Sequence, residues 1–251
     1  MTTPVQYLER AARPRLAFRH TPGTGPTIVF LPGYMSDMEG GKATALIDRA
    51  AAEGRACVLL DYAGCGASDG LFAEQDLLDW RGDILDLIDA RVAGPVIIVG
   101  SSMGGWLMLL AALALVARDG PARVAGLVGI AAAPDFTDWG FTAEEKAILL
   151  AEGELREDTP YSDQPYVTTR RFWQSGEANR LLDAPIALAC PVRLLHGEAD
   201  GDVPSAISLR LSAALTSDDV QVTLVKGGDH RLSRDTDIAL LIDTVARLAT
   251  A

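Results

Sequence analysis

The sequence is poor in basic residues. It holds 22 lysines and arginines against 34 aspartates and glutamates in 251 residues, which gives a formal net charge of −12. A nucleic-acid-binding chain needs a basic surplus to neutralise phosphates, and an anionic membrane face attracts the same surplus. We therefore expect neither nucleic acid nor a charged membrane surface as a partner of this protein.

Cysteine is also scarce, and long hydrophobic runs are absent. Cys57, Cys65 and Cys190 form no CxxC or other metal-ligand spacing, and an odd number of thiols is typical of reduced core residues. The longest apolar run, Trp106–Val116, is far shorter than the roughly 20 residues that cross a bilayer. Residues 1–20 contain no apolar segment of a secretory signal. We expect a cytoplasmic protein with no transmembrane segment, no metal and no cofactor.

Short apolar runs alternate with amphipathic segments along most of the chain. Continuous apolar runs are typical of strands that are buried on both faces of a parallel sheet. The alternation predicts an α/β fold, a mostly parallel doubly wound sheet in a single domain of residues 1–251. The expected strands are Thr27–Leu31, Ala56–Leu60, Val96–Val99, Leu127–Ile130, Val192–Leu195 and Val220–Val225, with Arg15–His20 as an edge strand. The expected helices are Lys42–Glu53, Glu74–Val92, Met103–Arg118, Ser205–Leu215 and Asp237–Leu248.

One stretch, residues 134–186, interrupts this alternation and is called the insertion below. Residues 135–176 hold seven of the fifteen aromatic residues of the chain, which argues for an ordered segment. Long excursions from a compact domain usually carry function. The insertion is either a helical pair that packs on the domain or a cap over a pocket, and we favour the cap. The seven aromatic residues are Phe136, Trp139, Phe141, Tyr161, Tyr166, Phe172 and Trp173.

The sequence Gly100-Ser101-Ser102-Met103-Gly104 has the pattern G-x-S-x-G. It follows a predicted strand and opens a predicted helix, which is the context that a nucleophile elbow requires. Gly100 and Gly104 allow close packing around a strained turn, and the helix directs free N–H groups at the site. The pattern favours Ser102 as a nucleophile. The alternative is a glycine-rich turn with a helix-capping serine.

Serine needs a base, and the chain offers three histidines. His20 precedes the first predicted parallel strand, and His196 ends a buried run, so both are expected to be structural. His230 follows the last predicted strand and alone leaves room for the order serine, acid, histidine. We therefore predict that His230 is the general base.

The orienting acid is expected in the loop that follows Val192–Leu195. That loop offers Glu198, Asp200 and Asp202, and any of them could hold the base in the right tautomer. Asp202 lies just before Val203-Pro204 and is suited to cap the next helix.

The oxyanion that forms on attack needs two N–H donors. The amide after the nucleophile, that of Met103, is one candidate. The loop after the first central strand supplies the other, and the amide of Tyr34 is the natural choice because Gly33 gives that loop room to turn. The alternative is an ordinary Pro-Gly strand exit.

Several motifs, in one order, resemble those of the α/β-hydrolase superfamily, and the chain is most similar to its branch of mitochondrial acyl-glucuronide esterases and palmitoyl-protein thioesterases. The resemblance runs from about residue 27 to 248. It implies a Ser102–Asp200–His230 triad and cofactor-free hydrolysis of acyl esters or thioesters. The chain lacks a clear presequence, so we do not carry the mitochondrial location over. The motifs are FLPGYMSD at 30–37, DYAGCG at 61–66, GSSMGGWLM at 100–108, CPVRLLHG at 190–197 and DHRL at 229–232.

Position within the loop also favours Asp200 as the acid, since the small Ala199 and Gly201 flank it and permit a tight turn. We expect a serine hydrolase that acts on small-molecule or acylated-protein esters or thioesters, with medium or long acyl groups or acyl-glucuronides. The alternatives are a short-chain carboxylesterase, a peptidase and a non-catalytic binding module on the same fold. The sequence identifies no substrate-binding residue and no oligomeric state.

Overall fold

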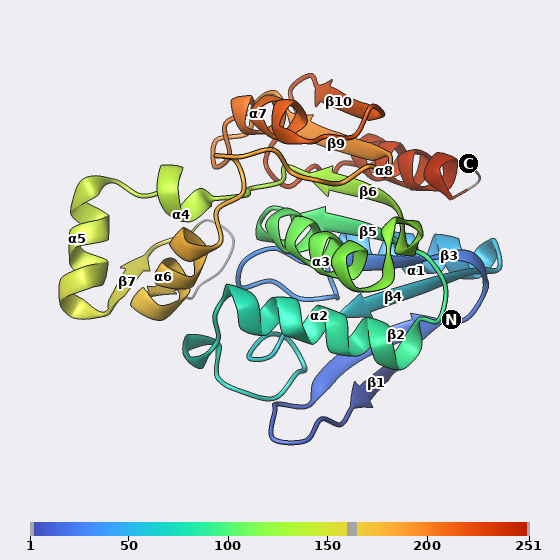
Figure 1. The fold of residues 1–251 in the computed structure, drawn as a ribbon, viewed down its shortest axis with the longest axis horizontal. Coiled ribbons are helices and arrows are strands. Elements are labelled where there is room, and N and C mark those ends of the chain that lie inside the picture. The colour runs from blue at the N-terminus through green and yellow to red at the C-terminus, as the bar shows by residue number, and fades with distance from the viewer. Residues whose placement is uncertain (1–2, 160–164, 250–251) are drawn as a thin grey trace.

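The computed structural model describes residues 3–159 and 165–249. Eight strands form one sheet in the order β1-β2-β4-β3-β5-β6-β9-β10 (Figure 1). The pairs from β4 to β10 are parallel, whereas β1 and β2 add an antiparallel edge. The prediction of a mostly parallel doubly wound sheet is confirmed. The strands are β1 (Val5–Leu8), β2 (Leu16–Thr21), β3 (Thr24–Leu31), β4 (Arg55–Leu60), β5 (Val96–Ser101), β6 (Val124–Ile130), β9 (Val192–Gly197) and β10 (Val220–Val225).

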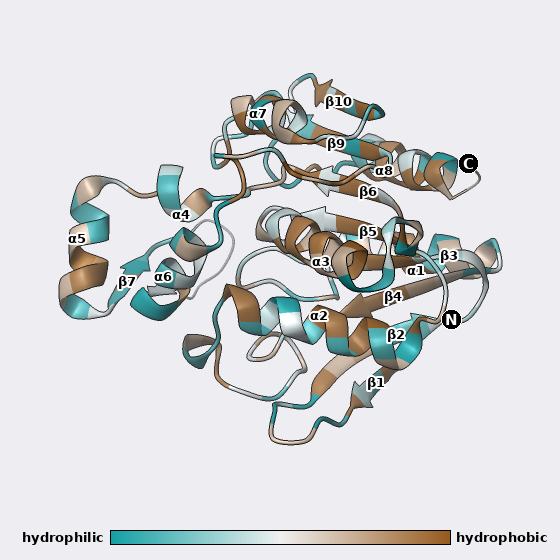
Figure 2. Cartoon of the chain, viewed as in Figure 1, coloured by the Kyte–Doolittle hydropathy of each residue, from teal (hydrophilic) through white to brown (hydrophobic). Residues whose placement is uncertain are grey.

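Helices cover both faces of the sheet and divide the core in two. On one face, α2 (Leu77–Arg91), α3 (Met103–Asp119) and α7 (Ala206–Ala214) bury one set of strand side chains. On the other face, α1 (Gly41–Ala52) and α8 (Asp235–Leu248) bury the alternate set. In Figure 2, α3 is apolar over most of its length, which fits its position against the centre of the sheet. Two 3₁₀ helices, η1 (Phe72–Glu74) and η2 (Pro121–Arg123), lie in loops.

The insertion leaves the sheet between β6 and β9 and lies beyond the end to which the parallel strands point (Figure 1). Its helices are joined by an antiparallel hairpin that the sequence did not predict. Tyr161 lies outside the described residues. The elements are α4 (Phe136–Trp139), α5 (Ala143–Glu152), β7 (Glu154–Glu157), β8 (Tyr166–Thr169) and α6 (Arg170–Ala178).

A buried carboxylate joins the two ends of the insertion. Asp135 has a left-handed backbone, with φ of 59°, and is almost completely buried. Its side chain accepts hydrogen bonds from the N–H groups of Leu181, at 2.8 Å, and Leu182, at 2.7 Å. Burial raises the pKa of Asp135, and these two backbone donors counteract that rise. The insertion therefore starts and ends at one fixed point on the domain.

The helices of the described segments, 3–159 and 165–249, include none with both the length and the apolar character needed to cross a bilayer.

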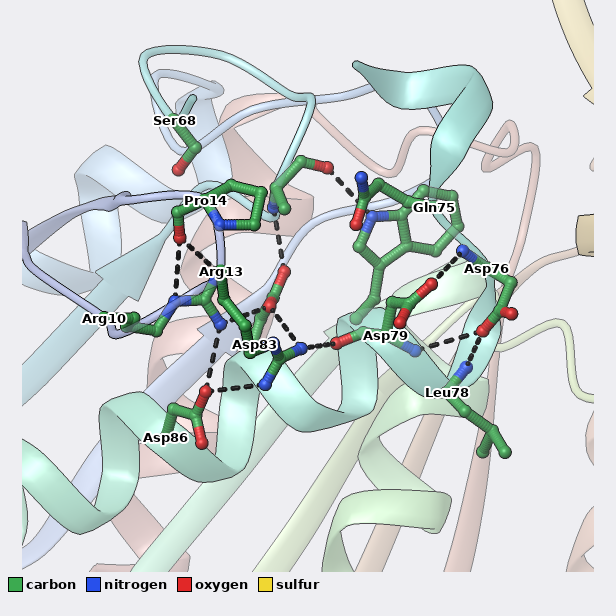
Figure 3. Close-up of polar contacts among 12 residues, drawn as sticks. Arg10, Arg13, Pro14, Ser68, Gln75, Asp76, Leu78, Asp79, Asp83 and Asp86 are labelled. Atoms are coloured by element: carbon green, nitrogen blue, oxygen red, sulfur yellow. Dashed lines mark hydrogen bonds and ion pairs between the residues drawn. The ribbon is translucent and has the colours of Figure 1, made fainter. Parts of the chain in front are cut away.

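A buried ion-pair cluster fastens the N-terminal edge of the sheet to α2 (Figure 3). The side chain of Asp83 is fully buried and lies 2.6 Å from a guanidinium nitrogen of Arg10 and 3.1 Å from one of Arg13. Its second oxygen accepts a hydrogen bond of 2.8 Å from the N–H of Ala63. Burial raises the pKa of Asp83, while the Ala63 N–H and the two guanidinium groups act against that rise. Asp86 contacts the same two arginines but is 40% exposed.

We predict that Asp83→Ala lowers the free energy of unfolding by about 3–5 kcal/mol, because it removes the fully buried partner of Arg10 and leaves the N–H of Ala63 without its acceptor. Urea denaturation of the purified variant measures this change. The matched control is Asp86→Ala, which removes a half-exposed partner and is expected to cost at most about 1 kcal/mol. Equal losses in the two variants would show that burial of Asp83 does not set the strength of this cluster.

Candidate active site

Ser102 occupies a strained turn between β5 and α3. Its φ of 54° and ψ of −121° lie outside the regions that a residue with a side chain normally adopts. The turn is held from both sides, because the Ser102 N–H donates to the carbonyl of Ile130 at 2.9 Å. The Ser102 carbonyl accepts from Gly105 at 2.8 Å and from Ala133 at 3.1 Å. These bonds to and beyond the end of β6 support a conformation that the serine alone would not keep.

The two glycines of the turn are required by close backbone contacts. A Cβ atom on Gly100 would collide with the carbonyl of Gly104, and one on Gly104 would collide with the carbonyl of Leu31 at the end of β3. Their spacing around Ser102 therefore lets the first turn of α3 pack directly on the sheet. This is the arrangement that the G-x-S-x-G pattern predicts.

Three side chains that the sequence singled out lie in one hydrogen-bonded series. The Nε2 atom of His230 is 3.1 Å from Oγ of Ser102, and its Nδ1 atom is 3.0 Å from Oδ2 of Asp200. A carboxylate only accepts, so Nδ1 carries the hydrogen and Nε2 is free to accept from the serine hydroxyl. Asp200 and His230 follow β9 and β10, which are parallel neighbours, so the sheet itself brings their loops together.

Asp200 is the most deeply buried member of this series, with 1% of its side chain exposed. Its Oδ1 atom accepts from the N–H groups of Asp202 and Val203, both at 2.9 Å. Burial alone raises the pKa of this carboxyl, but hydrogen bonds from two imidazole rings and from the Val203 N–H outweigh it and hold the pKa well below its usual range. The buried carboxylate therefore stays ionised at neutral pH.

The other two acids of the loop have different surroundings. Glu198 forms an exposed ion pair of 2.9 Å with Lys226. Asp202 is exposed, and the expectation that it caps the next helix is wrong. α7 begins at Ala206 after Ser205, which makes no side-chain capping bond. The reason is local, since Asp200 itself accepts the N–H of Asp202 and tightens the loop before the helix starts.

The remaining histidines differ from each other. His20 lies in β2, which pairs with β1 on one side and β4 on the other, so the prediction of an edge strand at 15–20 is wrong. Burial, followed by the charge of Arg91, lowers the pKa of His20. His196, at the end of β9, is completely buried, and its Nε2 atom is 3.2 Å from Oδ2 of Asp200. Sequence reasoning set His196 aside as structural and missed this contact. The signal was its position, four residues before Asp200 at the carboxyl end of a strand.

The loop after β3 passes beside the serine. A Cβ atom on Gly33 would lie 3.3 Å from Cβ and 4.0 Å from Oγ of Ser102, so the chain runs past the hydroxyl at close range. Tyr34 follows directly, and Met103 is the first residue of α3, whose N–H has no partner within its own helix. The two amides expected to bind an oxyanion thus belong to residues on either side of Ser102.

Ser102 and His230 line a cavity of about 580 Å³ between the sheet and the insertion. One part of the wall is aromatic and includes Tyr34, whose side-chain hydroxyl donates to the carbonyl of Val167 in β8 at 2.7 Å. The loop that carries Tyr34 is thereby attached to the insertion. The other aromatic residues of the wall are Phe136, Trp139, Phe141 and Tyr166.

Another part of the lining is polar and includes Ser36, Lys42 and Ser233. The ammonium group of Lys42 donates to the carbonyl of Arg231, next to His230 in the chain. Burial, and then the charge of Arg231, lower the pKa of Lys42 to about 8. The first turn of α1 therefore supports the loop of the histidine and gives this side of the cavity a basic group.

In the described part of the chain, one group of side chains has the spacing of metal ligands. The ligand atoms of Asp200, Asp202 and His230 lie within 4.8 Å of one another. Asp200 and His230 already hydrogen-bond each other, and nothing in their geometry calls for an ion.

Comparison with known proteins agrees with this geometry. The human protein described as palmitoyl-protein thioesterase ABHD10, mitochondrial, is 40% identical over 247 residues, which cover 97% of this chain and 79% of the relative. The structure of the mouse alpha/beta hydrolase domain-containing protein 10 superposes with a TM-score of 0.89 at 39% identity, covering 98% of each chain. A putative hydrolase from Agrobacterium vitis S4 gives a TM-score of 0.91 at 38% identity, again over 98% of each chain.

The same comparison corrects the expected location. The human and mouse relatives, both 40% identical, are described as mitochondrial, so the prediction of a cytoplasmic protein is wrong. That prediction depended on the scarcity of cysteine and of long apolar runs and on the N-terminal residues, whereas the similarity to these relatives extends over the whole folded domain.

The model of the alpha/beta hydrolase family matches residues 28–244, from within the central strand β3 to within α8. The match includes the turn of Ser102, the loop of Asp200 and the loop of His230. The chain therefore belongs to the alpha/beta hydrolase family, and it is a hydrolase.

Proposed function

We propose that the protein hydrolyses carboxylic esters and thioesters through a Ser102–Asp200–His230 triad. The observation that carries this proposal is the hydrogen-bonded series from Ser102 to His230 to Asp200, with distances of 3.1 and 3.0 Å, which opens into the cavity at the serine. Serine is a poor nucleophile until a base removes its proton, and the imidazole lies where that transfer is direct.

The reaction has two halves. In the first, Oγ of Ser102 attacks the acyl carbonyl while Nε2 of His230 takes its proton, and the imidazolium then protonates the departing alcohol or thiol. In the second, water attacks the acyl-enzyme while His230 takes its proton. The bond between the acyl carbon and Oγ of Ser102 then breaks, His230 returns the proton to Oγ, and the acid leaves. Asp200 stabilises the imidazolium in both halves because its carboxylate is ionised and bonded to Nδ1.

The amides of Tyr34 and Met103 form the oxyanion hole in this proposal. Met103 begins α3, so its N–H faces the site with the positive end of the helix dipole. The loop of Tyr34 can lie close to Ser102 because Gly33 has no side chain. Loss of a single donor of this kind usually costs about 10²–10³-fold in kcat.

The insertion acts as a cap that makes the acyl site, within a single domain of residues 1–251. The aromatic wall built by Phe136, Trp139 and Phe141 favours medium or long acyl chains, and the thioesterase description of the human relative points the same way. The polar wall with Lys42 and Ser233 suits a polar leaving group, such as the sugar of an acyl-glucuronide. A short-chain esterase, a peptidase and a non-catalytic binder remain outcomes of the tests below.

The first prediction concerns the nucleophile. A fluorophosphonate probe, which reacts with activated serines, is expected to label Ser102 and no other residue. Ser102→Ala should abolish labelling, while the adjacent Ser101→Ala keeps it and serves as the matched control. Mass spectrometry of the labelled peptide reads out the result. Undiminished labelling of Ser102→Ala would remove the assignment, and an unreactive unmodified protein would favour a binding module.

The second prediction concerns the acid. Asp200→Asn is expected to fold and to lose about 10⁴-fold in kcat, because the amide cannot hold His230 in the required tautomer. Asp202→Asn, two residues away and exposed, should stay within a few-fold of the unmodified enzyme. Thermal melts together with steady-state hydrolysis of a p-nitrophenyl ester separate folding from chemistry. Reversed behaviour of the two variants would make Asp202 the acid.

The third prediction concerns the acyl group. Each methylene that enters the aromatic part of the cavity is worth about 0.8 kcal/mol, or roughly fourfold. Extension of a p-nitrophenyl or thioester substrate from C4 to C8 should therefore raise kcat/KM by about two orders of magnitude. A flat or falling profile from C2 to C8 would contradict an acyl channel under the insertion and would favour a short-chain esterase.

A further inference from the structure

The acid of the proposed triad is held by a second histidine. Oδ2 of Asp200 lies 3.0 Å from Nδ1 of His230 and 3.2 Å from Nε2 of His196, so two imidazole rings meet on one carboxylate oxygen. His196 is completely buried, and the side chain of Asp200 is 1% exposed. The contact between them is therefore shielded from water on both sides.

The partners of His196 determine which of its nitrogens carries a hydrogen. Nε2 lies 2.9 Å from the carbonyl of Val203 as well as 3.2 Å from the carboxylate of Asp200. Both of these groups only accept, so Nε2 must donate, and it shares its hydrogen between them. Nδ1 of the neutral ring then has a free lone pair.

A buried serine from α7 supplies the donor that this lone pair needs. Oγ of Ser208 lies 2.7 Å from Nδ1 of His196, and Ser208 is completely buried. Its hydroxyl is free to donate to Nδ1, which fixes the tautomer with hydrogen on Nε2. The series of hydrogen bonds thus extends from Ser208 through His196 and Asp200 to His230 and Ser102.

We propose that His196 and Ser208 are positioning residues for catalysis, which hold the Asp200 carboxylate in the orientation that aligns His230 with Ser102. This inference rests on the triad proposed above. The backbone N–H groups of Asp202 and Val203 anchor Oδ1, and His196 contacts Oδ2, the oxygen that also faces His230. Without His196, His230 alone would fix Oδ2, and the carboxylate would gain freedom to turn.

The placement of His196 distinguishes this role from that of a core histidine satisfied within its own surroundings. The carbonyl of Val203 and the hydroxyl of Ser208 already provide both ring nitrogens with a partner. The contact with Asp200 is additional, and it falls on the one oxygen that faces the proposed base. Asp202, which lies near this carboxylate, is exposed to solvent and donates its backbone N–H to Asp200.

The test replaces His196 in two ways in the full-length enzyme. His196→Leu removes the donor, and we expect kcat for a p-nitrophenyl ester to fall by about 10–100-fold with KM little changed, as for a small misplacement of reacting groups. His196→Gln keeps an amide N–H near the position of Nε2 and should recover most of that loss. Ser208→Ala should give a smaller loss in the same direction.

Leu211→Ala is the matched control, because Leu211 is also completely buried on α7, one turn after Ser208, and carries no polar group. It is expected to lower the melting temperature without lowering kcat of the folded enzyme. The double variant with Asp200→Asn tests the route of the effect. If His196 acts through Asp200, addition of His196→Leu to Asp200→Asn should cause little further loss of kcat.

The outcomes separate this inference from the proposed function. If Asp200→Asn is fully active, the triad itself is wrong. The positioning role predicts a loss of about tenfold or more in kcat for His196→Leu. If Asp200→Asn is inactive but the folded His196→Leu variant keeps kcat within about twofold of the unmodified enzyme, only the positioning role is overturned. Fully additive losses in the double variant would also overturn it. If His196→Leu fails to fold, the other two variants decide. An unchanged kcat in Ser208→Ala would count against the positioning role. A loss of kcat in His196→Gln as large as in other folded variants at position 196 would also count against it.

Discussion

The site depends on a backbone conformation that Ser102 would not adopt unaided. Its positive φ is kept by hydrogen bonds to Ile130, Gly105 and Ala133, and by glycines that let α3 begin in contact with β3. The residues that support the turn come from the end of β6, from the segment between β6 and the insertion, and from α3 itself. The position of Ser102, the proposed nucleophile, is therefore a property of the assembled sheet. The strain is acceptable because neighbouring elements over-determine the turn.

The pKa of Asp200 depends on hydrogen-bond donors at the carboxyl ends of the parallel strands, where Ser102 also lies. Two buried carboxylates in the molecule have opposite shifts, which their donors explain. Asp83 has a raised pKa although two arginines approach it, whereas Asp200, with two imidazoles and two backbone N–H groups, has a strongly lowered one. At Asp200 the hydrogen bonds outweigh the cost of burial, whereas at Asp83 burial outweighs its donors. A buried carboxylate that stays ionised can stabilise the imidazolium form of a neighbouring histidine, as the proposed role of Asp200 requires.

Much of this arrangement could be predicted from the sequence. Apolar runs predicted where the central strands lie along the chain, and only three histidines had to be considered to select His230. The hairpin β7-β8 and the strand β1 were not predicted. These strands are short and little buried, so their sequences show no strong alternation of apolar and polar residues. The capping role expected for Asp202 was wrong, since a local preference for capping was outweighed by the hydrogen bonds that Asp200 draws from the loop. His196 escaped because a buried histidine in a strand has the same sequence signature whether it touches the acid or not.

The insertion and the site are mechanically joined at more than one point. Tyr34 follows Gly33, the residue of its loop that lies close to Ser102. The hydroxyl of Tyr34 donates a hydrogen bond to a backbone carbonyl of β8, and its ring packs edge-on against Phe136 and Tyr166. Asp135, which fixes both ends of the insertion, follows the residues that hold the Ser102 turn. Under the proposed function, a substrate that fills the aromatic wall would press on the same side chains that position the proposed oxyanion donor. The binding of a long acyl chain and the alignment of the reacting groups would then be coupled, so that contacts remote from the carbonyl would contribute to kcat as well as to KM.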